Sequence, residues 1–402
     1  MTNSIQEIRD ADFLLVIGSN TSEAHPIIAM EMKRAVHRGA TLVVVDPRAV
    51  WMTTISEHHL QIKPGSDVWL LNAMANVIIS EGLVADEFVT KQTENFESVK
   101  AAVKDYTPEA AEAFTGIAPD LLRKVARQYA STPKAGIYYT LGITEHSHGT
   151  DNVYALANLV LMTGHLGQPS SGMNPLRGQN NVQGANDAGA TPVFYPGYQL
   201  VDDPKAQKLF EEAWDCELDP EPGLNLNEMM QTMGESIKGI FVMGEDIVLS
   251  EPNAHHLEAA LAGVEFIAIQ EPFPNETMRF ANVVFPSAVF AEKDGVFTNS
   301  ERRVQLVRQA VAPPGEARQD WRILSDLAKA VGLDWNYESP AEIYAEMAAL
   351  TPKFKGISHE RLGEIQADGM TGIQWPCPTS DHPGTVYLHG DGIMRGKGLF
   401  HA

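Results

Sequence analysis

Short, wholly apolar runs alternate with amphipathic stretches along the first part of the chain. Apolar runs of this length, bounded by glycine and polar residues, are typical of strands buried in a parallel sheet. Apolar residues recurring with a helical period predict helices, the first of which starts at a proline and stops before a glycine. The strands expected are Phe13–Ile17, Thr41–Val45, Leu60–Ile62 and Gly136–Leu141, and the helices are Pro26–His37, Val68–Ser80 and Asn152–Thr163, with more helix between residues 86 and 129.

This opening pattern recurs near residue 240. There are 28 residues from Gly18 to Asp46 and 26 from Gly244 to Gln270, each span beginning where one expected strand ends and closing where the next one ends. The further strands expected are Ile240–Met243, Val264–Ile269 and Val283–Pro286, and the helices are Asn253–Ala262, Asp320–Val331 and Ala341–Leu350. Strand–turn–helix–strand units bind mononucleotides, so the duplication indicates one long ligand or two nucleotides. The alternative is that one unit is only scaffold.

The turn Gly18-Ser19-Asn20-Thr21-Ser22-Glu23 lacks the G-x-G-x-x-G fingerprint, which argues against simple NAD binding. Other polar residues at the strand ends allow two interpretations each. Arg48 suits a phosphate, a guanine or a surface ion pair. Asp67 suits a helix cap or the edge of a phosphate site. His146, together with the histidine two positions later, suits a pocket lining better than a metal, because no third ligand is evident.

Composition narrows the class of protein. The net charge of −22 disfavours binding to nucleic acid or to an anionic membrane, and it requires local cations wherever an anion binds. No apolar run reaches 18 residues, and the first residues lack the layout of a signal peptide, so we expect a cytoplasmic protein with no membrane insertion. The two cysteines, Cys216 and Cys377, form no C-x-x-C motif, so no zinc or iron–sulfur site of the chain's own is expected.

The most unusual stretch is the central run Asn174–Gly184, which reads Asn-Pro-Leu-Arg-Gly-Gln-Asn-Asn-Val-Gln-Gly. Four side-chain amides follow Arg177 within six positions. An arginine offers a planar fork for a carboxylate or phosphate, and each amide offers both a donor and an acceptor. The pattern favours a binding loop, with a solvated turn as the alternative.

The central run is similar to the active-site arginine loop of the molybdenum- or tungsten-dependent formate dehydrogenases, within the molybdopterin oxidoreductase (dimethyl-sulfoxide-reductase-like) superfamily. The resemblance extends over essentially the whole chain. It is supported by Asp46-Pro47-Arg48, Met162-Thr163-Gly164, Met243-Gly244-Glu245-Asp246 and Glu292-Lys293-Asp294-Gly295-Val296-Phe297-Thr298-Asn299. Cys377 does not match the metal-ligand position of the family, and we interpret it as structural.

The resemblance implies two Rossmann-like, doubly wound α/β domains related by a pseudo-twofold duplication. We expect the first over residues 1–179 and the second over 180–330, each binding one molybdopterin guanine dinucleotide, with a loop-rich connection over 331–402. It also implies that the N-terminal 4Fe–4S domain, the metal-ligating cysteine or selenocysteine, and the C-terminal barrel domain of the family lie outside this chain, which would then be a fragment.

The site residues follow from the same resemblance, position by position. Arg177 is the expected catalytic residue, orienting formate. Gln179 and His146 are expected beside the pterin, and no residue of the chain is expected to bind the metal. The first dinucleotide site is expected to comprise Gly18, Asn20, Glu23, Asp46, Arg48, Gly65, Asp67 and Gly142, and the second Met243, Gly244, Glu245, Asp246, Gln270 and Asp320. Asp246 and Asp320 suit the donor groups of guanine.

The implied reaction is the oxidation of formate to carbon dioxide, or its reverse, at molybdenum or tungsten held by a bis-molybdopterin guanine dinucleotide. Electrons would pass to an iron–sulfur cluster, and the partners would be electron-transfer subunits or domains that carry such clusters. One alternative is another molybdopterin oxidoreductase, such as a nitrate reductase. The other is a non-catalytic scaffold that retains the fold. The arginine loop argues against the first, and the polar turns at both nucleotide edges argue against the second.

Overall fold

The computed structural model describes residues 1–366 and 368–402, and these residues form two compact units. The first unit comprises Met1–Asn180, Ser300–Arg302 and Thr385–Ala402, and the second comprises Asn181–Asn299 and Arg303–Gly384. This division differs from the one expected. The proposed connection over 331–402 forms no unit of its own, because its residues are shared between the two.

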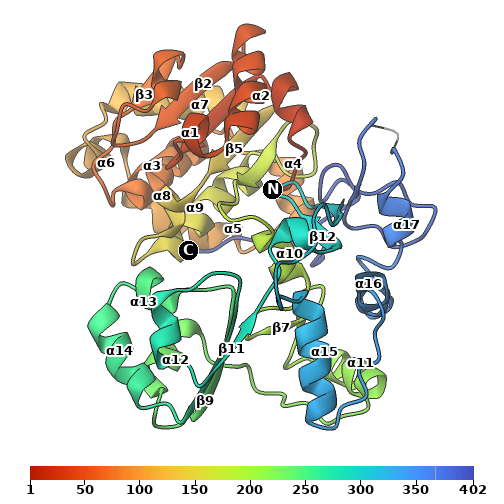
Figure 1. Cartoon of the computed structure of the whole chain (residues 1–402). Coiled ribbons are helices and arrows are strands. Elements are labelled where there is room, and N and C mark those ends of the chain that lie inside the picture. Colours follow the sequence, from red (N-terminus) through yellow and green to blue (C-terminus); the bar gives the residue numbers. More distant parts are fainter. Residues whose placement is uncertain (367) are drawn as a thin grey trace. The chain divides into compact units, whose positions relative to one another are not determined.

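The first unit is built on a five-stranded parallel sheet in the order β3-β2-β1-β5-β6 (Figure 1). Its strands are β1 (Phe13–Ile17), β2 (Thr41–Val45), β3 (His58–Leu60), β5 (Ala135–Tyr139) and β6 (Gly172–Pro175). A separate pair joins β4 (Thr93–Glu94) to β15 (Gly398–Leu399). The strand expected at Leu60–Ile62 was misplaced. It lies over His58–Leu60, where the polar histidines hid it from a search for apolar runs.

Helices cover both faces of this sheet, and alternate residues of each strand feed the two cores. On β1, Leu15 and Ile17 pack into one core with α3, α6, α7 and α9, whereas Leu14 and Val16 pack into the other with α2 and η1. These helices are η1 (Gln6–Asp10), α2 (Pro26–His37), α3 (Asp67–Ser80), α6 (Pro108–Thr115), α7 (Pro119–Ser131) and α9 (Gly149–Met162). The shorter ones are α1 (Thr21–Ala24), η2 (Trp51–Thr54), α4 (Asp86–Gln92), α5 (Phe96–Ala102), η3 (Val103–Asp105) and α8 (Leu141–Thr144). The doubly wound arrangement explains why β1, β2 and β5 are buried along nearly their whole length.

The second unit contains a three-stranded parallel sheet, β11-β10-β9, and a separate antiparallel sheet, β12-β13-β14. The strands are β7 (Phe194–Tyr195), β8 (Gln199–Leu200), β9 (Gly239–Met243), β10 (Phe266–Glu271), β11 (Val283–Pro286), β12 (Gly295–Thr298), β13 (Arg303–Val307) and β14 (Ile373–Gln374). The helices are α10 (Val182–Asp187), α11 (Pro204–Trp214), α12 (Leu226–Thr232), α13 (Ile247–Ser250), α14 (Ala254–Ala262), η4 (Glu276–Phe280), η5 (Phe290–Glu292), α15 (Asp320–Ala330), α16 (Pro340–Ala349) and α17 (His359–Leu362).

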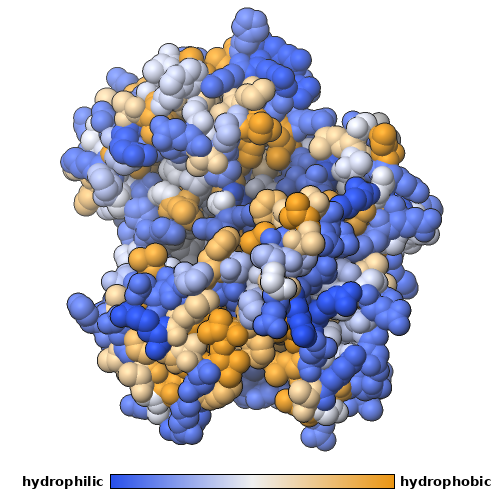
Figure 2. Space-filling model, viewed as in Figure 1, coloured by the Kyte–Doolittle hydropathy of each residue, from blue (hydrophilic) through white to orange (hydrophobic). Residues whose placement is uncertain are grey.

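The two faces of this parallel sheet differ in how far they are buried. Val242, Ile267 and Ile269 form a core with side chains of α13 and α14. On the other face Phe241 is 37% and Phe266 is 51% exposed, and Figure 2 shows hydrophobic side chains at the surface over β11. The parallel sheet of the second unit is therefore smaller than that of the first unit and more exposed on one face.

A buried histidine in the first unit gives the fold a pH dependence. His165 is 3% exposed, and its ring bonds to Thr163 Oγ1 and Thr132 O, both at 2.9 Å. Burial lowers the pKa of His165 to about 4, although the Thr132 bond acts in the opposite direction. The folded state therefore resists protonation at a position that an unfolded chain protonates near pH 6.5.

We expect the stability of the parent protein to fall as the pH drops from about 6.5 to about 4, since only the unfolded chain binds this proton across that window. The loss attributable to His165 is about 3 kcal/mol. His165→Gln cannot titrate, so its free energy of unfolding should depend less on pH when measured with denaturant between pH 7.5 and 4.5. Replacement of the exposed His37 by Gln serves as the control. Equal slopes in parent and H165Q would contradict the prediction.

Candidate functional site

In the first unit most of the expected site residues lie just after the carboxyl ends of the parallel strands. Parallel strands bring these ends to one edge of a sheet, where open α/β folds bind ligands. The loop after β1 carries Gly18 and Asn20, the loop after β2 carries Asp46, the turn after β5 carries Gly142, and β6 leads into Arg177. The strand order reverses between β1 and β5, so this edge includes a topological switch point.

At that switch point the backbones of two loops meet. The Gly18 carbonyl accepts hydrogen bonds from the Gly142 amide at 3.2 Å and the Thr140 hydroxyl at 2.6 Å. A Cβ on Gly18 would lie 2.7 Å from the Gly142 carbonyl carbon, and a Cβ on Gly142 would lie 2.6 Å from the Gly18 oxygen. Gly18 also has a φ of +57°. Both positions therefore require glycine. The contact between the two loops is enough to explain a glycine at position 18, whether or not a ligand also approaches it.

The loop after β1 holds polar atoms that are buried but unpaired. Asn20 Oδ1, Ser22 Oγ and His25 Nδ1 have no hydrogen-bond partner among the described residues. A buried unpaired polar atom typically costs about 1–3 kcal/mol. Three of them within six residues at the ligand edge indicate a surface shaped to meet polar groups of a bound molecule. Glu23, in the same loop, is exposed.

The loop after β2 presents one cation. Asp46 is 6% exposed, and its Oδ1 accepts the backbone N–H of Arg48 at 2.8 Å, so this carboxylate shapes the turn. The Arg48 side chain is exposed and has no ion pair with any described residue. The guanidinium is thus available to an anion, which removes the surface ion pair as an explanation for Arg48. Gly65, in the loop before α3, has a φ of +79° and open space around it.

Asp67 and His146 lie near each other at the same edge. Their carboxylate oxygen and Nε2 atoms are 3.9 Å apart, and His146 Nε2 also bonds to the Gly142 carbonyl at 2.9 Å. Burial raises the pKa of Asp67, while its own backbone amide and the charges of His146 and His148 act in the opposite direction. Asp67 is the first residue of α3, and the N-cap residue Ser66 makes no side-chain cap bond. Helix capping therefore does not account for a buried carboxyl beside a histidine.

Arg177 follows the last ladder bond of the edge strand β6. Leu176 N donates to Tyr139 O at 2.9 Å, and the next residue leaves the sheet. Burial raises the pKa of Tyr139 to about 12, and the positive charge of Arg177 acts against that rise. Gln179 is exposed. The arginine is therefore half-buried at the ligand edge, with its expected neighbour in solvent.

The amides after Arg177 do not form one ligand-facing cluster. Asn181 Oδ1 accepts the Thr298 N–H at 2.9 Å, and Gln183 donates to Asp187 at 2.8 Å, both within the second unit. Asp187 also accepts the Trp375 indole N–H at 2.7 Å. Half of the amides that suggested ligand binding in the sequence thus have structural partners, and the composition of the run overstated their number in the site.

In the second unit the turn after β9 repeats the turn after β1. The Gly244 amide donates to Gln270 O at 2.9 Å with a φ of +67°, as the Gly18 amide donates to Val45 O at 3.0 Å. Gln270 is fully buried and donates its amide to Asp320 Oδ1 at 2.8 Å, while its Oε1 has no partner among the described residues. The same local geometry thus recurs at the carboxyl edge of both parallel sheets.

Asp320 and Asp246 are less available than the sequence suggested. Lys293 Nζ forms an ion pair with Asp320 Oδ2, and Asp320 Oδ1 already accepts from Gln270. Burial alone would raise the pKa of Asp246, but the Thr277 hydroxyl at 2.6 Å and the backbone amides at the start of η4 lower it on balance. Asp246 thus caps η4, and the lysine near Asp320 supplies a cation that the expected site omitted.

Two further carboxylates, Glu271 and Glu245, lie at this edge of the second unit. Burial and repulsion from Asp246, Glu245 and Asp320 raise the pKa of Glu271. Glu245 accepts from the Ser250 hydroxyl at 2.6 Å. A cavity of about 470 Å³ lies beside these groups, lined by Met243, Lys293 and Asp320 and otherwise mostly by apolar and aromatic side chains of the same unit.

Comparisons with known proteins identify the family of this chain. Residues 1–330 match the family model of the molybdopterin oxidoreductases. The chain belongs to that family. It is 46% identical over 400 residues to the F420-dependent formate dehydrogenase subunit alpha of Methanocaldococcus jannaschii, and 38% identical over 403 residues to formate dehydrogenase H of Escherichia coli. Each alignment covers 99% of this chain but 58% and 56% of the relative, so the chain spans little more than half the length of these proteins.

The fold agrees with that assignment. Acetylene hydratase from Pelobacter acetylenicus superposes with a TM-score of 0.71 over 98% of this chain and 58% of that protein, at 18% identity. Membership of the molybdopterin oxidoreductases implies a molybdopterin cofactor. No group of three or more potential metal-ligating side chains occurs in residues 1–366 and 368–402, and no helix there is long and apolar enough to cross a membrane.

The described residues fit a polar cofactor of this kind. The first unit offers an unpaired Asn20 oxygen, an exposed Arg48 and a glycine-bounded edge, and the second offers an unpaired Gln270 oxygen beside Lys293. Sequence reasoning found the glycines and acids because they directly follow apolar runs. It missed Lys293, whose partner lies 27 residues away, although the stretch containing it had supported the resemblance.

The approach of Gly18 to Gly142 gives a direct test of the first edge. Gly18→Ala adds a methyl group to a left-handed residue and drives it into the Gly142 backbone. Gly39→Ala is the matched control, since Gly39 also has positive φ (+100°) but has no atom within 4 Å of its Cβ position. G39A should cost about 1–2 kcal/mol in thermal unfolding, and G18A clearly more. Equal losses would show that the close approach does not constrain this edge.

Proposed function

We propose that this chain forms the cofactor-binding and substrate-orienting part of a formate dehydrogenase catalytic subunit. The single observation that supports this most strongly is Arg177, half-buried at the carboxyl edge of the first sheet in a chain related to formate dehydrogenases. The reaction is HCOO⁻ → CO₂ + H⁺ + 2 e⁻, or its reverse. The substrate carries one negative charge and the organic product carries none.

Arg177 would distinguish substrate from product by charge. A guanidinium offers two parallel N–H donors to a carboxylate, and it loses that interaction when the ligand becomes linear and neutral. A fixed cation therefore orients formate and favours release of carbon dioxide. The chain as a whole carries a net charge of −22, so an anion reaches this edge only where local cations such as Arg177 and Arg48 offset the field.

Each unit would hold one molybdopterin guanine dinucleotide of a bis-molybdopterin cofactor with molybdenum or tungsten. In the first unit Asn20, Glu23, Asp46, Arg48 and Asp67 would contact one dinucleotide. In the second unit Gln270, Lys293 and Asp320 would contact the other. In the first unit, Gly18, Gly65, Gly142, His146 and Gln179 complete the proposed set; in the second, Met243, Gly244, Glu245 and Asp246 complete it. When bound, the metal–pterin group accepts the two electrons of the reaction.

The electrons would then pass to an iron–sulfur cluster carried by another part of the enzyme or by an electron-transfer subunit. The proposed partners of the chain are therefore such a domain or subunit and the pair formate and carbon dioxide. A cytoplasmic location fits an acidic chain that uses a small soluble anion. These assignments are supported by the relatedness to formate dehydrogenases over nearly all of this chain.

The cofactor assignment predicts guanine nucleotide in the protein. Protein produced as the complete subunit in a cofactor-making host should release guanine nucleotide on acid hydrolysis, together with molybdenum or tungsten. Asp320→Ala should lower that content several-fold, because it removes the carboxylate between Gln270 and Lys293. Asp326→Ala, which affects only an exposed ion pair on the same helix, should not. Parent protein free of guanine nucleotide would exclude this part of the proposal.

The substrate assignment predicts that Arg177→Lys keeps the charge but loses the fork. We expect kcat/KM for formate to fall about 10- to 100-fold, equivalent to about 1.5–3 kcal/mol for a charge-assisted interaction. Arg34→Lys, on the exposed face of α2, is the control. Unchanged formate kinetics in R177K, or turnover of nitrate in place of formate by the parent, would contradict the assignment.

A further inference from the structure

We propose that His25 and Ser300 are positioning residues that fix Arg177 from both sides of its backbone. The inference rests on the proposed function, in which the Arg177 side chain orients formate. Neither residue belongs to the expected site. Both are far from Arg177 in the sequence, by 152 and 123 positions. All three belong to the first unit.

The two contacts are complementary. The Arg177 carbonyl oxygen lies 2.7 Å from His25 Nε2, and the Arg177 amide donates to Ser300 Oγ at 3.2 Å. A carbonyl only accepts, so the first contact requires a proton on Nε2 and defines the ring orientation. The residue that carries the guanidinium therefore has both of its backbone polar groups held by side chains.

Arg177 needs such supports because of its place in the sheet. β6 is an edge strand that pairs only with β5, and its last ladder bond is made by the residue before Arg177. Beyond that bond, no strand in residues 1–366 or 368–402 pairs with this part of the backbone. An arginine side chain rotates freely about several bonds, so a precise carboxylate fork requires that its Cα–Cβ direction be fixed first. The side chains of His25 and Ser300 bond instead to the carbonyl and the amide of Arg177.

The backbone of His25 is held by hydrogen bonds on both sides. It lies between α1 and α2, where its amide donates to Thr21 O at 2.9 Å and its carbonyl accepts from Ala29 N at 2.9 Å. Its ring therefore projects from a junction tied to two helices at the ligand edge. The other ring nitrogen is the buried, unpaired Nδ1, which in this tautomer is an acceptor. The imidazole thus bonds to the Arg177 carbonyl through Nε2, and its unpaired Nδ1 belongs to the same loop as the unpaired atoms of Asn20 and Ser22.

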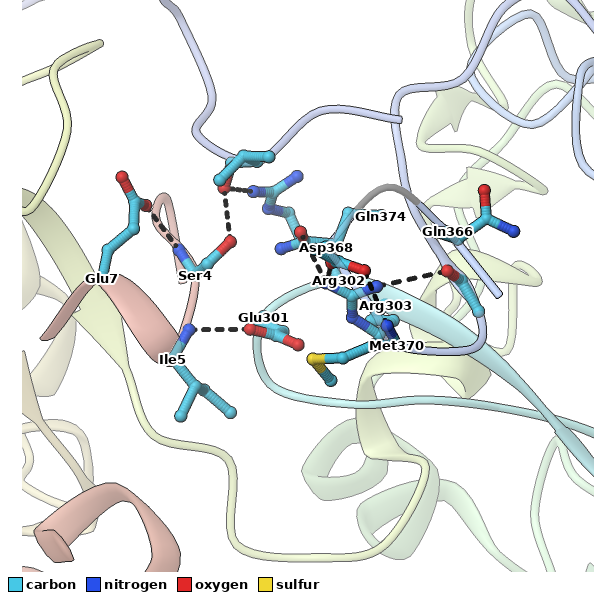
Figure 3. A network of polar contacts seen from close by, with 12 residues as sticks. Ser4, Ile5, Glu7, Glu301, Arg302, Arg303, Gln366, Asp368, Met370 and Gln374 are labelled. Atoms are coloured by element: carbon cyan, nitrogen blue, oxygen red, sulfur yellow. Dashed lines mark hydrogen bonds and ion pairs between the residues drawn. The ribbon is translucent and has the colours of Figure 1, made fainter. Parts of the chain in front are cut away.

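The two residues that follow Ser300 hold its backbone in place through bonds to other segments of the first unit. Glu301 accepts the Ile5 amide at 2.7 Å, and the fully buried Arg302 donates to the carbonyls of Met1, Thr2, Thr385 and Val386 at 2.9–3.1 Å. Figure 3 shows this network around Glu301 and Arg302. The serine therefore lies two residues before a buried cation that is bonded to two segments, residues 1–2 and 385–386, and this holds its backbone more firmly than an exposed loop would.

The test uses the complete, cofactor-loaded enzyme and two readouts. One readout is kcat and KM for formate. The other is hydrogen exchange of the peptide containing residues 176–180, which does not depend on turnover. His25→Leu and Ser300→Ala remove the contacts. His25→Gln and Ser300→Thr restore a donor and an acceptor at similar reach, and His37→Leu is an exposed-histidine control.

We expect H25L and S300A to lower kcat/KM for formate at least about tenfold, in part through a higher KM, and to speed exchange of that peptide. H25Q and S300T should recover most of both readouts, and H37L should match the parent. A purely structural role would change cofactor content and melting temperature without selective exchange at residues 176–180, and that result would overturn the inference.

The outcomes also separate this inference from the proposed function. Formate kinetics lost in R177K but retained within twofold in both H25L and S300A would refute the positioning role alone. Unchanged formate kinetics in R177K would refute the proposed function, and the positioning of Arg177 for formate would be refuted with it. Poor rescue by both H25Q and S300T, with normal cofactor content, would likewise count against the hydrogen bonds as the cause.

Discussion

The parallel sheet of the first unit, buried on both faces, is the constraint on which the candidate site depends. Successive residues of β1 pack into opposite cores, so a shift of one residue would leave the strand apolar but would displace everything after it. Parallel register brings the ends of β1, β2, β5 and β6 to one edge. The polar turns meet at this edge because all these strands run parallel and end there.

The two units have the same turn at the ligand edge of their parallel sheets, but the residues packed around that turn differ. Each begins its ligand edge with a left-handed glycine whose amide bonds to the end of the next strand. The first unit supports that turn by packing Gly18 on Gly142, whereas Gly244 has open space around it. The second sheet also has fewer strands, and one of its faces is more exposed. Stability and ligand geometry are therefore more tightly coupled in the first unit.

The sequence predicted β1, β2 and β5 of the first unit well because these strands are almost wholly apolar and are bounded by glycine or polar residues. It misplaced β3, where two histidines interrupt the pattern, and it gave no strand at β6, whereas the three parallel strands of the second unit lie close to their predicted positions. Glycines and acids at strand ends were found because their meaning is local. His25, Ser300 and Lys293 were missed because each matters through a partner remote in the sequence, and a single sequence does not reveal such partners. The same limit explains why Asn181 and Gln183 were taken for ligand groups.

The chain path through the first unit has a consequence for how the protein is made. The segment Ser300–Arg302 returns to this unit after the chain has built much of the second one, and Thr385–Ala402 returns later still. The late segment adds β15 beside β4 and buries Phe400 in the first core. During synthesis the five-stranded sheet can therefore form early, while the backbone of Arg177 acquires its second support only after residue 300 leaves the ribosome. The order of translation thus separates the assembly of the scaffold from the final setting of the arginine.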